Sequence, residues 1–545
     1  MNHLALADYV VFFIYFIVVV GYGYWIYQRR RSTETNTTDF FLAEGSLTWW
    51  AIGASMIASN ISAEHFIGMA GSGFAMGLAI SSYEWIAAAT LIVVAIFFIP
   101  IYLRNHIYTM PQFLAQRYSP TVSTILAVFW LVVYVLVNLT SILYLGAIAI
   151  ESLAGLSFTT CTIGLAVFSI FITLGGMKVI GYTDVIQVTV LVIGGLVVTY
   201  LALQLVADQT GASGIWDGLV ALRKQADSHF HLYFREGHPH YDALPGMSLV
   251  LGGMWLNNLY YWGCNQYIVQ RTLGADLKTA RAGILFAAFL KLVIPLIVVI
   301  PGIAAYVLYQ EGTFRAAMTD ASGVVKPDHA YPVLMNLLPI GMKGLAFAAL
   351  TAAVVASLAG KCNSIATIFT LDIYKKFFDK DASERKLVNV GRWAVLVSFA
   401  IAIVLAPMLR SFDQVYQYIQ EYTNFITPGV FAIFLLGFFW KRATNRAALT
   451  VAILTIPFST LLKFWPEMMS VIDIEADPIP FLHRTTWVFC LDVALMVIIT
   501  LTDPAGVPLN KGLIVERRMF RVSPSFVVGA VAIFGVLAVL YSVFW

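Results

Sequence analysis

The hydrophobic residues of this chain are grouped in long blocks that polar stretches separate. The short hydrophobic periods typical of a soluble protein are not the main pattern. Fourteen blocks are predominantly apolar, and most of them are long enough to cross about 30 Å of hydrocarbon as a helix. We therefore predict an all-α integral membrane protein with fourteen transmembrane helices. The blocks cover residues 7–27, 49–72, 79–103, 122–152, 157–178, 182–207, 246–270, 284–309, 336–374, 389–407, 412–440, 447–465, 482–502 and 524–545.

Two of these blocks are interrupted by polar residues at membrane depth. The stretch Ala58-Ser-Asn-Ile-Ser-Ala-Glu-His65 divides one, and Asn257-Asn-Leu-Tyr-Tyr-Trp-Gly-Cys-Asn-Gln266 divides the other. An unpaired backbone group in hydrocarbon costs several kcal/mol, so such a break is tolerated inside protein or beside a water-filled cavity. Paired breaks at matching places in two halves predict a binding site near the midplane. For each break alone, a polar kink satisfied by neighbouring helices is the alternative.

The positions of the breaks also predict how the chain is organised. Each break lies in the first helix of a group of five, so we predict two five-helix repeats, 49–207 and 246–440. An odd number of helices makes the repeats enter the membrane from opposite sides, as an inverted repeat. One extra helix, 7–27, precedes them and three helices, 447–545, follow, so that 1–545 forms a single transmembrane transporter domain.

Composition and charge agree with a multi-pass membrane protein. The chain is 60% hydrophobic and only 12% charged, whereas a soluble protein carries about 25% charged residues. Of the 33 Lys and Arg residues, 22 fall in one set of alternate loops and 9 in the other, and Lys291 and Lys361 lie inside blocks. The positive-inside rule then places both termini outside. This orientation fits a protein of the plasma membrane or of the bacterial inner membrane. The net charge of +3 gives no indication of a nucleic-acid partner.

Polar side chains inside the blocks indicate what the site binds. Ionisable residues at membrane depth usually face the interior of the bundle and mark substrate or ion paths. Amides, carboxylates, a lysine and aromatic faces suit a neutral, polyhydroxylated ligand, and no intramembrane arginine is available to clamp a carboxylate with two hydrogen bonds. Two sets of polar residues share single helical faces: Asn258, Tyr261 and Asn265, and Gln417, Gln420 and Asn424.

Short polar motifs occur in many of these blocks, over nearly the whole chain. They include Asn60-Ile-Ser-Ala-Glu-His-Phe-Ile-Gly68, Ser82-Tyr-Glu-Trp85, Tyr182-Thr-Asp-Val-Ile-Gln187, Asn258-Leu-Tyr-Tyr-Trp-Gly263, Asn265-Gln-Tyr-Ile-Val-Gln-Arg-Thr272 and Tyr418-Ile-Gln-Glu-Tyr422. In these motifs the chain resembles the sodium/solute symporter family, particularly its sodium/glucose (galactose) branch. The resemblance implies a leucine-transporter-type 5+5 inverted repeat, with one helix before the core and three after it. It also implies sodium as the coupling ion.

The resemblance further implies roles for individual residues toward a small-molecule sugar. Tyr261 is expected to act as the inner-gate aromatic against the sugar ring, with Trp262 beside it. The outer gate is expected to consist of Met69, Tyr83 and Tyr416. Hydrogen bonds to the sugar are expected from His65, Glu84, Asn138, Asn258, Lys291 and Gln420. The carrier would work in the lipid bilayer as a monomer or weak homo-oligomer.

The sodium site that the resemblance implies departs from the family pattern in one ligand. Its ligands would be the carbonyls of Ala58, Ile61 and Ala353 and the hydroxyl of Ser357. Where the family has a second, adjacent hydroxyl, this chain has Ala356.

Lys361 lies four residues beyond Ser357, on the same helical face and about 6 Å along the axis. One hypothesis is that Lys361 is a tethered cation that pairs with Asp184 on the ion path and weakens or replaces sodium binding. The alternative is that Lys361 snorkels to the inner water layer and that sodium coupling is intact.

These observations together predict sodium-coupled symport of a hexose, galactose or glucose, by alternating access. A sodium-independent or proton-coupled sugar facilitator is one alternative, suggested by Ala356 and Lys361. A transporter-derived sugar sensor is another, although only the short stretch 503–523 separates the last two blocks. An enzyme is not expected, because the chain has no HExxH motif, nucleophile elbow or phosphate loop. The choice between sugars is left open.

Overall fold

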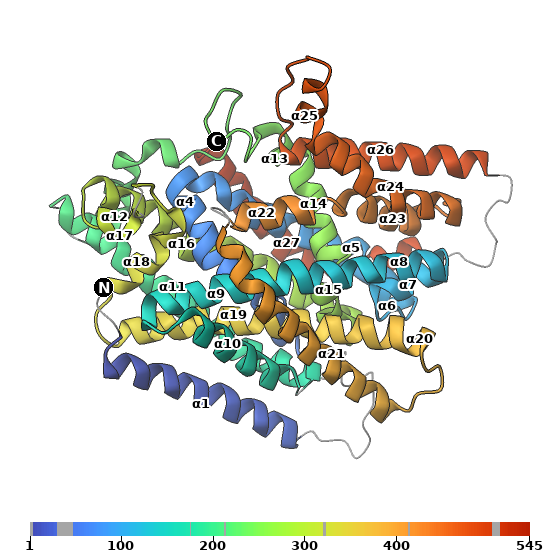
Figure 1. Cartoon of the computed structure of the whole chain (residues 1–545), viewed down its shortest axis with the longest axis horizontal. Helices are drawn as coiled ribbons and strands as arrows, with labels where there is room; N and C mark the ends of the chain where they lie inside the picture. The colour runs from blue at the N-terminus through green and yellow to red at the C-terminus, as the bar shows by residue number, and fades with distance from the viewer. Residues whose placement is uncertain are drawn as a thin grey trace.

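The computed structural model describes residues 4–29, 47–174, 176–211, 214–319, 323–411, 415–503 and 513–545. Within these ranges the chain forms helices, short turns and two isolated β-bridges, and it contains no β-strand. Long helices lie alongside one another in a single bundle, as Figure 1 shows. The predicted all-α class is therefore confirmed.

The helices coincide with the predicted apolar blocks, and every block contains helical residues. The principal helices are α1 (Leu6–Arg29), α3 (Trp49–Asn60), η1 (Glu64–Met69), α4 (Ala70–Met76), α5 (Ser82–Phe97), α8 (Pro120–Val132), η3 (Val133–Leu139), α9 (Thr140–Ala154), α10 (Phe158–Thr173), α11 (Gly176–Gln209), α14 (Gly253–Gly263), α15 (Gln266–Leu273), α16 (Leu277–Gln310), α19 (Met342–Thr367), η6 (Ile368–Tyr374), α21 (Glu384–Leu405), α22 (Val415–Thr423), α23 (Thr427–Phe439), α24 (Asn445–Lys463), α26 (Phe481–Thr502) and α27 (Pro524–Val543). Shorter helices connect them: η2 (Gly77–Ser81), α6 (Ile99–Arg104), α7 (Met110–Arg117), α12 (Ile215–Gln225), η4 (Asp227–His229), α13 (Gly246–Leu251), α17 (Arg315–Met318), η5 (Pro327–His329), α18 (Ala330–Asn336), α20 (Lys375–Phe377), η7 (Ala406–Ser411), α25 (Trp465–Ser470) and η9 (Arg517–Phe520).

Ten helical stretches of the described chain are long and apolar enough to cross a membrane. Two further apolar helices, α10 and α23, are shorter. The broken blocks are divided into pieces such as α3 and α14, which are too short to qualify by length. Membrane-spanning character is thus clear, whereas the number of fourteen crossings stays a prediction.

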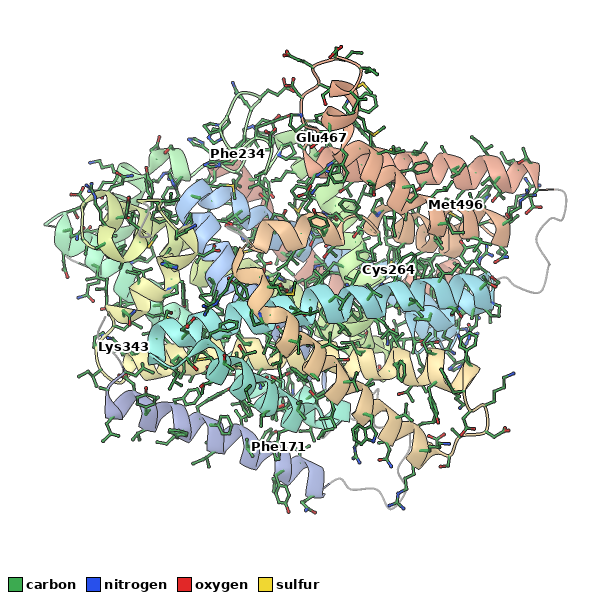
Figure 2. All side chains as sticks on the ribbon, viewed as in Figure 1. Phe171, Phe234, Cys264, Lys343, Glu467 and Met496 are labelled. Atoms are coloured by element: carbon green, nitrogen blue, oxygen red, sulfur yellow. The ribbon has the colours of Figure 1, made fainter. Side chains whose placement is uncertain are left out.

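Both predicted helix breaks are confirmed. Helix α3 ends at Asn60, the backbone is extended at Ile61 (φ −78°, ψ 119°), and η1 begins at Glu64. Helix α14 ends at Gly263, and α15 begins only after an extended residue, Asn265 (φ −104°, ψ 121°). Cys264, which lies in this second break, is labelled near the middle of the bundle in Figure 2. Each break leaves backbone N–H and C=O groups free of the helical hydrogen-bond pattern.

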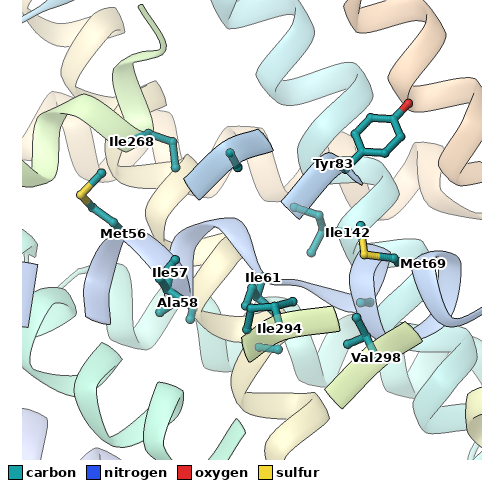
Figure 3. Packing of buried hydrophobic residues seen from close by; sticks show 14 of the residues in the cluster. Met56, Ile57, Ala58, Ile61, Met69, Tyr83, Ile142, Ile268, Ile294 and Val298 are labelled. Carbon is teal, nitrogen blue, oxygen red and sulfur yellow. The ribbon is translucent and has the colours of Figure 1, made fainter. Parts of the chain in front are cut away.

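Helix α16 holds the two parts of the first broken helix. A Cβ atom at Gly302 of α16 would lie 2.1 Å from the carbonyl oxygen of Ala70, and one at Gly53 of α3 would lie 2.5 Å from that of Gly283. Only glycine allows backbones to approach this closely. Between these contacts, Ile294 and Val298 of α16 belong to the same buried apolar cluster as Ile57 and Ile61 (Figure 3). The break is therefore surrounded by protein, as its unpaired backbone groups require.

Candidate functional site

A polar cavity lies between the two helix breaks. Its walls are formed by residues of η1, α5, η3, α14, α16 and α22, which are far apart in the sequence. All eight residues predicted to contact sugar line this cavity: His65, Glu84, Asn138, Asn258, Tyr261, Trp262, Lys291 and Gln420.

Lys291 and Glu84 form an ion pair in the wall of this cavity. Lys291 is 1% exposed, and its Nζ lies 2.5 Å from Oε2 of Glu84 on the neighbouring helix α5. The same ammonium donates to Oδ1 of Asn60 at the end of α3 and lies 5.1 Å from the centre of the Trp262 ring. A buried charge at membrane depth needs partners of this kind. The pair gives a ligand one cationic and one anionic group side by side.

His65 completes the hydrogen bonding of Glu84. The backbone N–H of Ser62 donates to Nδ1 of His65 at 3.4 Å, which leaves the proton on Nε2. Nε2 lies 3.4 Å from Oε1 of Glu84, so each carboxylate oxygen has its own partner. The imidazole in this position orients the carboxylate.

Tyr261 lines the cavity beside the second break. Its hydroxyl oxygen accepts hydrogen bonds from Nδ2 of Asn60, at 2.8 Å, and from the hydroxyl of Tyr267. Because both contacts use the oxygen as acceptor, the Tyr261 hydroxyl proton is available to a ligand. The ring of Trp262 stands edge-on to that of Tyr261 at 5.1 Å. Together these rings offer an aromatic wall for the C–H face of a sugar.

The three predicted outer-gate residues do not all line the cavity. Tyr83 lines the cavity, whereas Met69 is fully buried at the end of η1 and does not line it. Tyr416 falls in α22, but its side chain lies outside the described residues. The outer gate therefore stays a prediction for all three residues.

Three predicted sodium ligands meet at the first break. The hydroxyl of Ser357 on α19 donates to the carbonyl oxygens of Ala58, at 3.2 Å, and Ile61, at 3.0 Å. Figure 3 shows Ala58 and Ile61 on either side of the point where the chain leaves the helix. Ala353, the fourth predicted ligand, is fully buried one turn earlier on α19. Carbonyl and hydroxyl oxygens are hard ligands that suit a cation such as sodium.

Of the two hypotheses for Lys361, the one in which it pairs with Asp184 is wrong for this structure. Asp184 on α11 accepts a hydrogen bond from Ser55 at 2.5 Å and lies 3.8 Å from Arg271 of α15. Lys361 instead lines the central cavity, with its Nζ 4.7 Å from the centre of the Tyr267 ring. It is 4% exposed and has no ion pair within the described chain. The reason is that α15, not α19, presents the cation closest to Asp184.

Arg271 is a buried cation that the apolar pattern did not predict. It is 1% exposed, and its guanidinium donates to the hydroxyl of Ser59, 2.5 Å away. Arg271 does not line the cavity, and no arginine is among the described residues that do. Arg271 directly follows block 246–270. The second break divides this block, and burial of the residue that follows it could have been inferred from this position.

Replacing Asp184 by asparagine is expected to destabilise the protein by about 3–5 kcal/mol, because the buried ion pair between Asp184 and Arg271 would lose its negative partner. Thermal unfolding in detergent should show a midpoint several degrees lower. Asp492→Asn is the matched control, because Asp492 is also buried but has no basic partner in the described part of the chain. Equal midpoints for the two variants would contradict a charge interaction between Asp184 and Arg271.

Several other polar contacts around the cavity were also not predicted. Asn60 bridges Lys291 and Tyr261, and its position beside the first break was the available signal. The hydroxyl of Ser141 donates to Glu64 at 3.0 Å, and the hydroxyl of Tyr134 donates to Asn265. These contacts join elements distant in sequence, so no local pattern indicates them.

A membrane bundle with two broken helices around a polar cavity defines the class of multi-pass transporters. A family model described as "Sodium:solute symporter family" matches residues 40–455. The chain belongs to this family. Its predicted place among sodium-coupled symporters, and not among enzymes, is thereby confirmed at the level of the family.

Individual relatives agree with this assignment. A "Sodium/glucose cotransporter" of Vibrio parahaemolyticus is 45% identical, over 99% of each chain. "Sodium/myo-inositol cotransporter 2" of Homo sapiens is 34% identical, over 81% of this chain and 67% of that protein. The fold is similar to that of a solved Na⁺-coupled sialic acid symporter in a substrate-bound outward-open state, with a TM-score of 0.75 and 20% identity over 93% of this chain and 100% of that one.

Proposed function

We propose that this protein moves a hexose, galactose or glucose, across the membrane together with sodium. The observation that carries the proposal is that all eight predicted sugar contacts line one cavity, beside the break where Ala58, Ile61 and Ser357 meet. Paired carboxylate and ammonium groups, amides and an aromatic wall together suit the hydroxyl and C–H faces of a sugar ring. The name of the Vibrio relative, a sodium/glucose cotransporter, supports the same substrate class.

Transport would proceed by alternating access within an inverted repeat. In this proposal the helices 49–207 and 246–440 form the two repeats and both termini lie outside. Sodium at Ala58, Ile61, Ala353 and Ser357 would stabilise the break in the state that binds sugar. Coupling requires that both ligands favour one conformation, since a ligand indifferent to conformation shifts no equilibrium.

The direct test is uptake of radiolabelled galactose and glucose into proteoliposomes, with and without an inward sodium gradient. We expect accumulation above equilibrium for at least one sugar when the gradient is present. Equilibration that ignores sodium would show a facilitator, and no uptake of either sugar would show that the substrate is another solute.

Lys361 supports a second hypothesis about coupling, in which its ammonium partly replaces sodium. The side chain is buried, lines the cavity and lies one helical turn from Ser357 on α19. Glu64 is the other acidic residue of this cavity besides Glu84, which is already paired with Lys291. A fixed positive charge this close to a sodium site would oppose binding of the ion. The alternative, snorkelling with intact coupling, assigns Lys361 no effect on sodium.

Replacing Lys361 by methionine is expected to lower the sodium concentration that gives half-maximal uptake about tenfold, because a repelling charge is removed. Lys343→Met is the matched control, since Lys343 is a buried lysine of the same helix that does not line the cavity. Sodium-dependent uptake into proteoliposomes measures both variants. An unchanged sodium dependence in the Lys361 variant would exclude the hypothesis and support snorkelling.

A further inference from the structure

A second large groove, distinct from the sugar cavity, lies on the outside of the bundle between α16 and α27. Its lining is mainly apolar, with Leu285, Phe286 and Ile533 among the lining residues. Gly529 lets α27 approach α16 closely, because a Cβ atom there would lie 2.6 Å from the Leu285 side chain. Phe289 on one wall is 52% exposed. Since both helices are long and apolar enough to span the membrane, this groove faces lipid.

One end of the groove carries two basic residues. Lys278 and Arg281 line it near the first turns of α16, and Ser523 and Ser525 line it at the start of α27, where their hydroxyls contact each other at 3.0 Å. Lys278 is exposed, and its side chain has no ion pair within the described residues. Asp276, the acidic residue next to this end, is occupied as the N-cap of α16.

The charge of Arg281 is not neutralised by a carboxylate among the described residues. Arg281 is 8% exposed, and its guanidinium donates to backbone carbonyls, which fix its position without cancelling its charge. These carbonyls belong to Ala95, Ile96, Met519 and Arg521. A buried, uncompensated cation at the mouth of an apolar groove favours a ligand with an anionic head and an apolar tail.

We propose that this groove is a binding site for an anionic phospholipid of the surrounding membrane. One acyl chain would occupy the apolar floor, and the phosphate headgroup would contact Lys278 and the two serine hydroxyls. Basic pockets between membrane helices attract anionic headgroups in this way, with interaction strengths of about 1 kcal/mol per lysine or arginine. The predicted orientation places this end of the groove in the inner leaflet.

A second apolar groove of the same molecule provides an internal comparison. It encloses about 1400 Å³ between α1 and α10, with Phe12, Phe168 and Phe347 among its lining residues. No charged residue lines it within the described chain. We therefore expect it to accept acyl chains without preference for a headgroup.

Native mass spectrometry of the full-length protein tests the proposal. The protein would be released from nanodiscs that contain equal amounts of phosphatidylglycerol and phosphatidylcholine. We expect one phosphatidylglycerol to be retained in preference, and Lys278→Gln to reduce this preference about five-fold. Lys375→Gln removes an exposed lysine from a region predicted to lie on the same side, outside the groove, and should leave the preference unchanged.

A second pair of variants tests the groove itself. Ala532→Trp fills the space between the helices and should abolish the retained phosphatidylglycerol, whereas Val531→Trp, on the exposed side of α27, should not. Sugar uptake by each variant reports whether the protein is folded. Equal retention of the two lipids by the unaltered protein would overturn the proposal, as would equal effects of the two lysine variants or of the two tryptophan variants.

Discussion

Replacing Lys291 by methionine is expected to reduce sugar uptake at least a hundred-fold. The substitution removes a donor from the cavity and leaves Glu84 buried without its cation, 2.5 Å away in the unaltered protein. Breaking a buried pair in this way costs about 3–5 kcal/mol, and each factor of ten corresponds to about 1.4 kcal/mol. Initial rates of galactose or glucose uptake into proteoliposomes, at sugar concentrations below saturation, measure the effect.

The double variant Lys291→Met with Glu84→Gln separates stability from binding. It removes both charges, so thermal stability should recover relative to Lys291→Met, whereas uptake should not, because both ligand contacts are lost. Asp379→Asn breaks a surface pair with Lys386, 2.7 Å apart, and should change neither quantity measurably. Uptake by Lys291→Met within tenfold of the unaltered protein would contradict a role of this pair in sugar binding.

Replacing Ser357 by alanine is expected to raise the sodium concentration for half-maximal uptake by at least tenfold. Ser357 provides the hydroxyl that contacts the carbonyls of Ala58 and Ile61, at 3.2 and 3.0 Å. Hydrogen bonds and ligand contacts that involve a charge contribute about 1.5–3 kcal/mol each, which corresponds to a ten- to hundred-fold change in affinity. Sodium titrations of sugar uptake, at a fixed sugar concentration, provide the measurement.

Two further variants make the result specific to the sodium site. Ser357→Thr keeps the hydroxyl and should retain most of the sodium affinity. Ser364→Ala removes a hydroxyl from the same helix that donates to Gln270 at 2.9 Å and does not touch the first break. If Ser357→Ala and Ser364→Ala shift the sodium dependence equally, the effect reflects the packing of α19 and not a sodium ligand.

The sequence alone determined the class of fold, both helix breaks and the composition of the cavity. Long apolar blocks leave few alternatives to membrane helices, because every backbone group in hydrocarbon must find a partner within its own element. Polar residues inside such blocks are costly in contact with lipid, so their presence indicates side chains that face the interior of the bundle. His65, Glu84, Asn258 and Lys291 were predicted on this basis together with the family resemblance, and all of them line the cavity.

Only the tertiary structure decided how the buried charges are paired. The sequence showed a lysine one turn from Ser357 and an acid on a different helix. A pair between the two was one hypothesis, and a lysine that snorkels to the inner water layer was the other. The packing of α15 instead places Arg271 beside Asp184 and leaves Lys361 facing the cavity and the ring of Tyr267. The local sequence predicts that a charged residue is buried, because burial depends on the apolar residues next to it in the chain. The choice of partner depends on which helices lie side by side, and residues distant in the chain determine that.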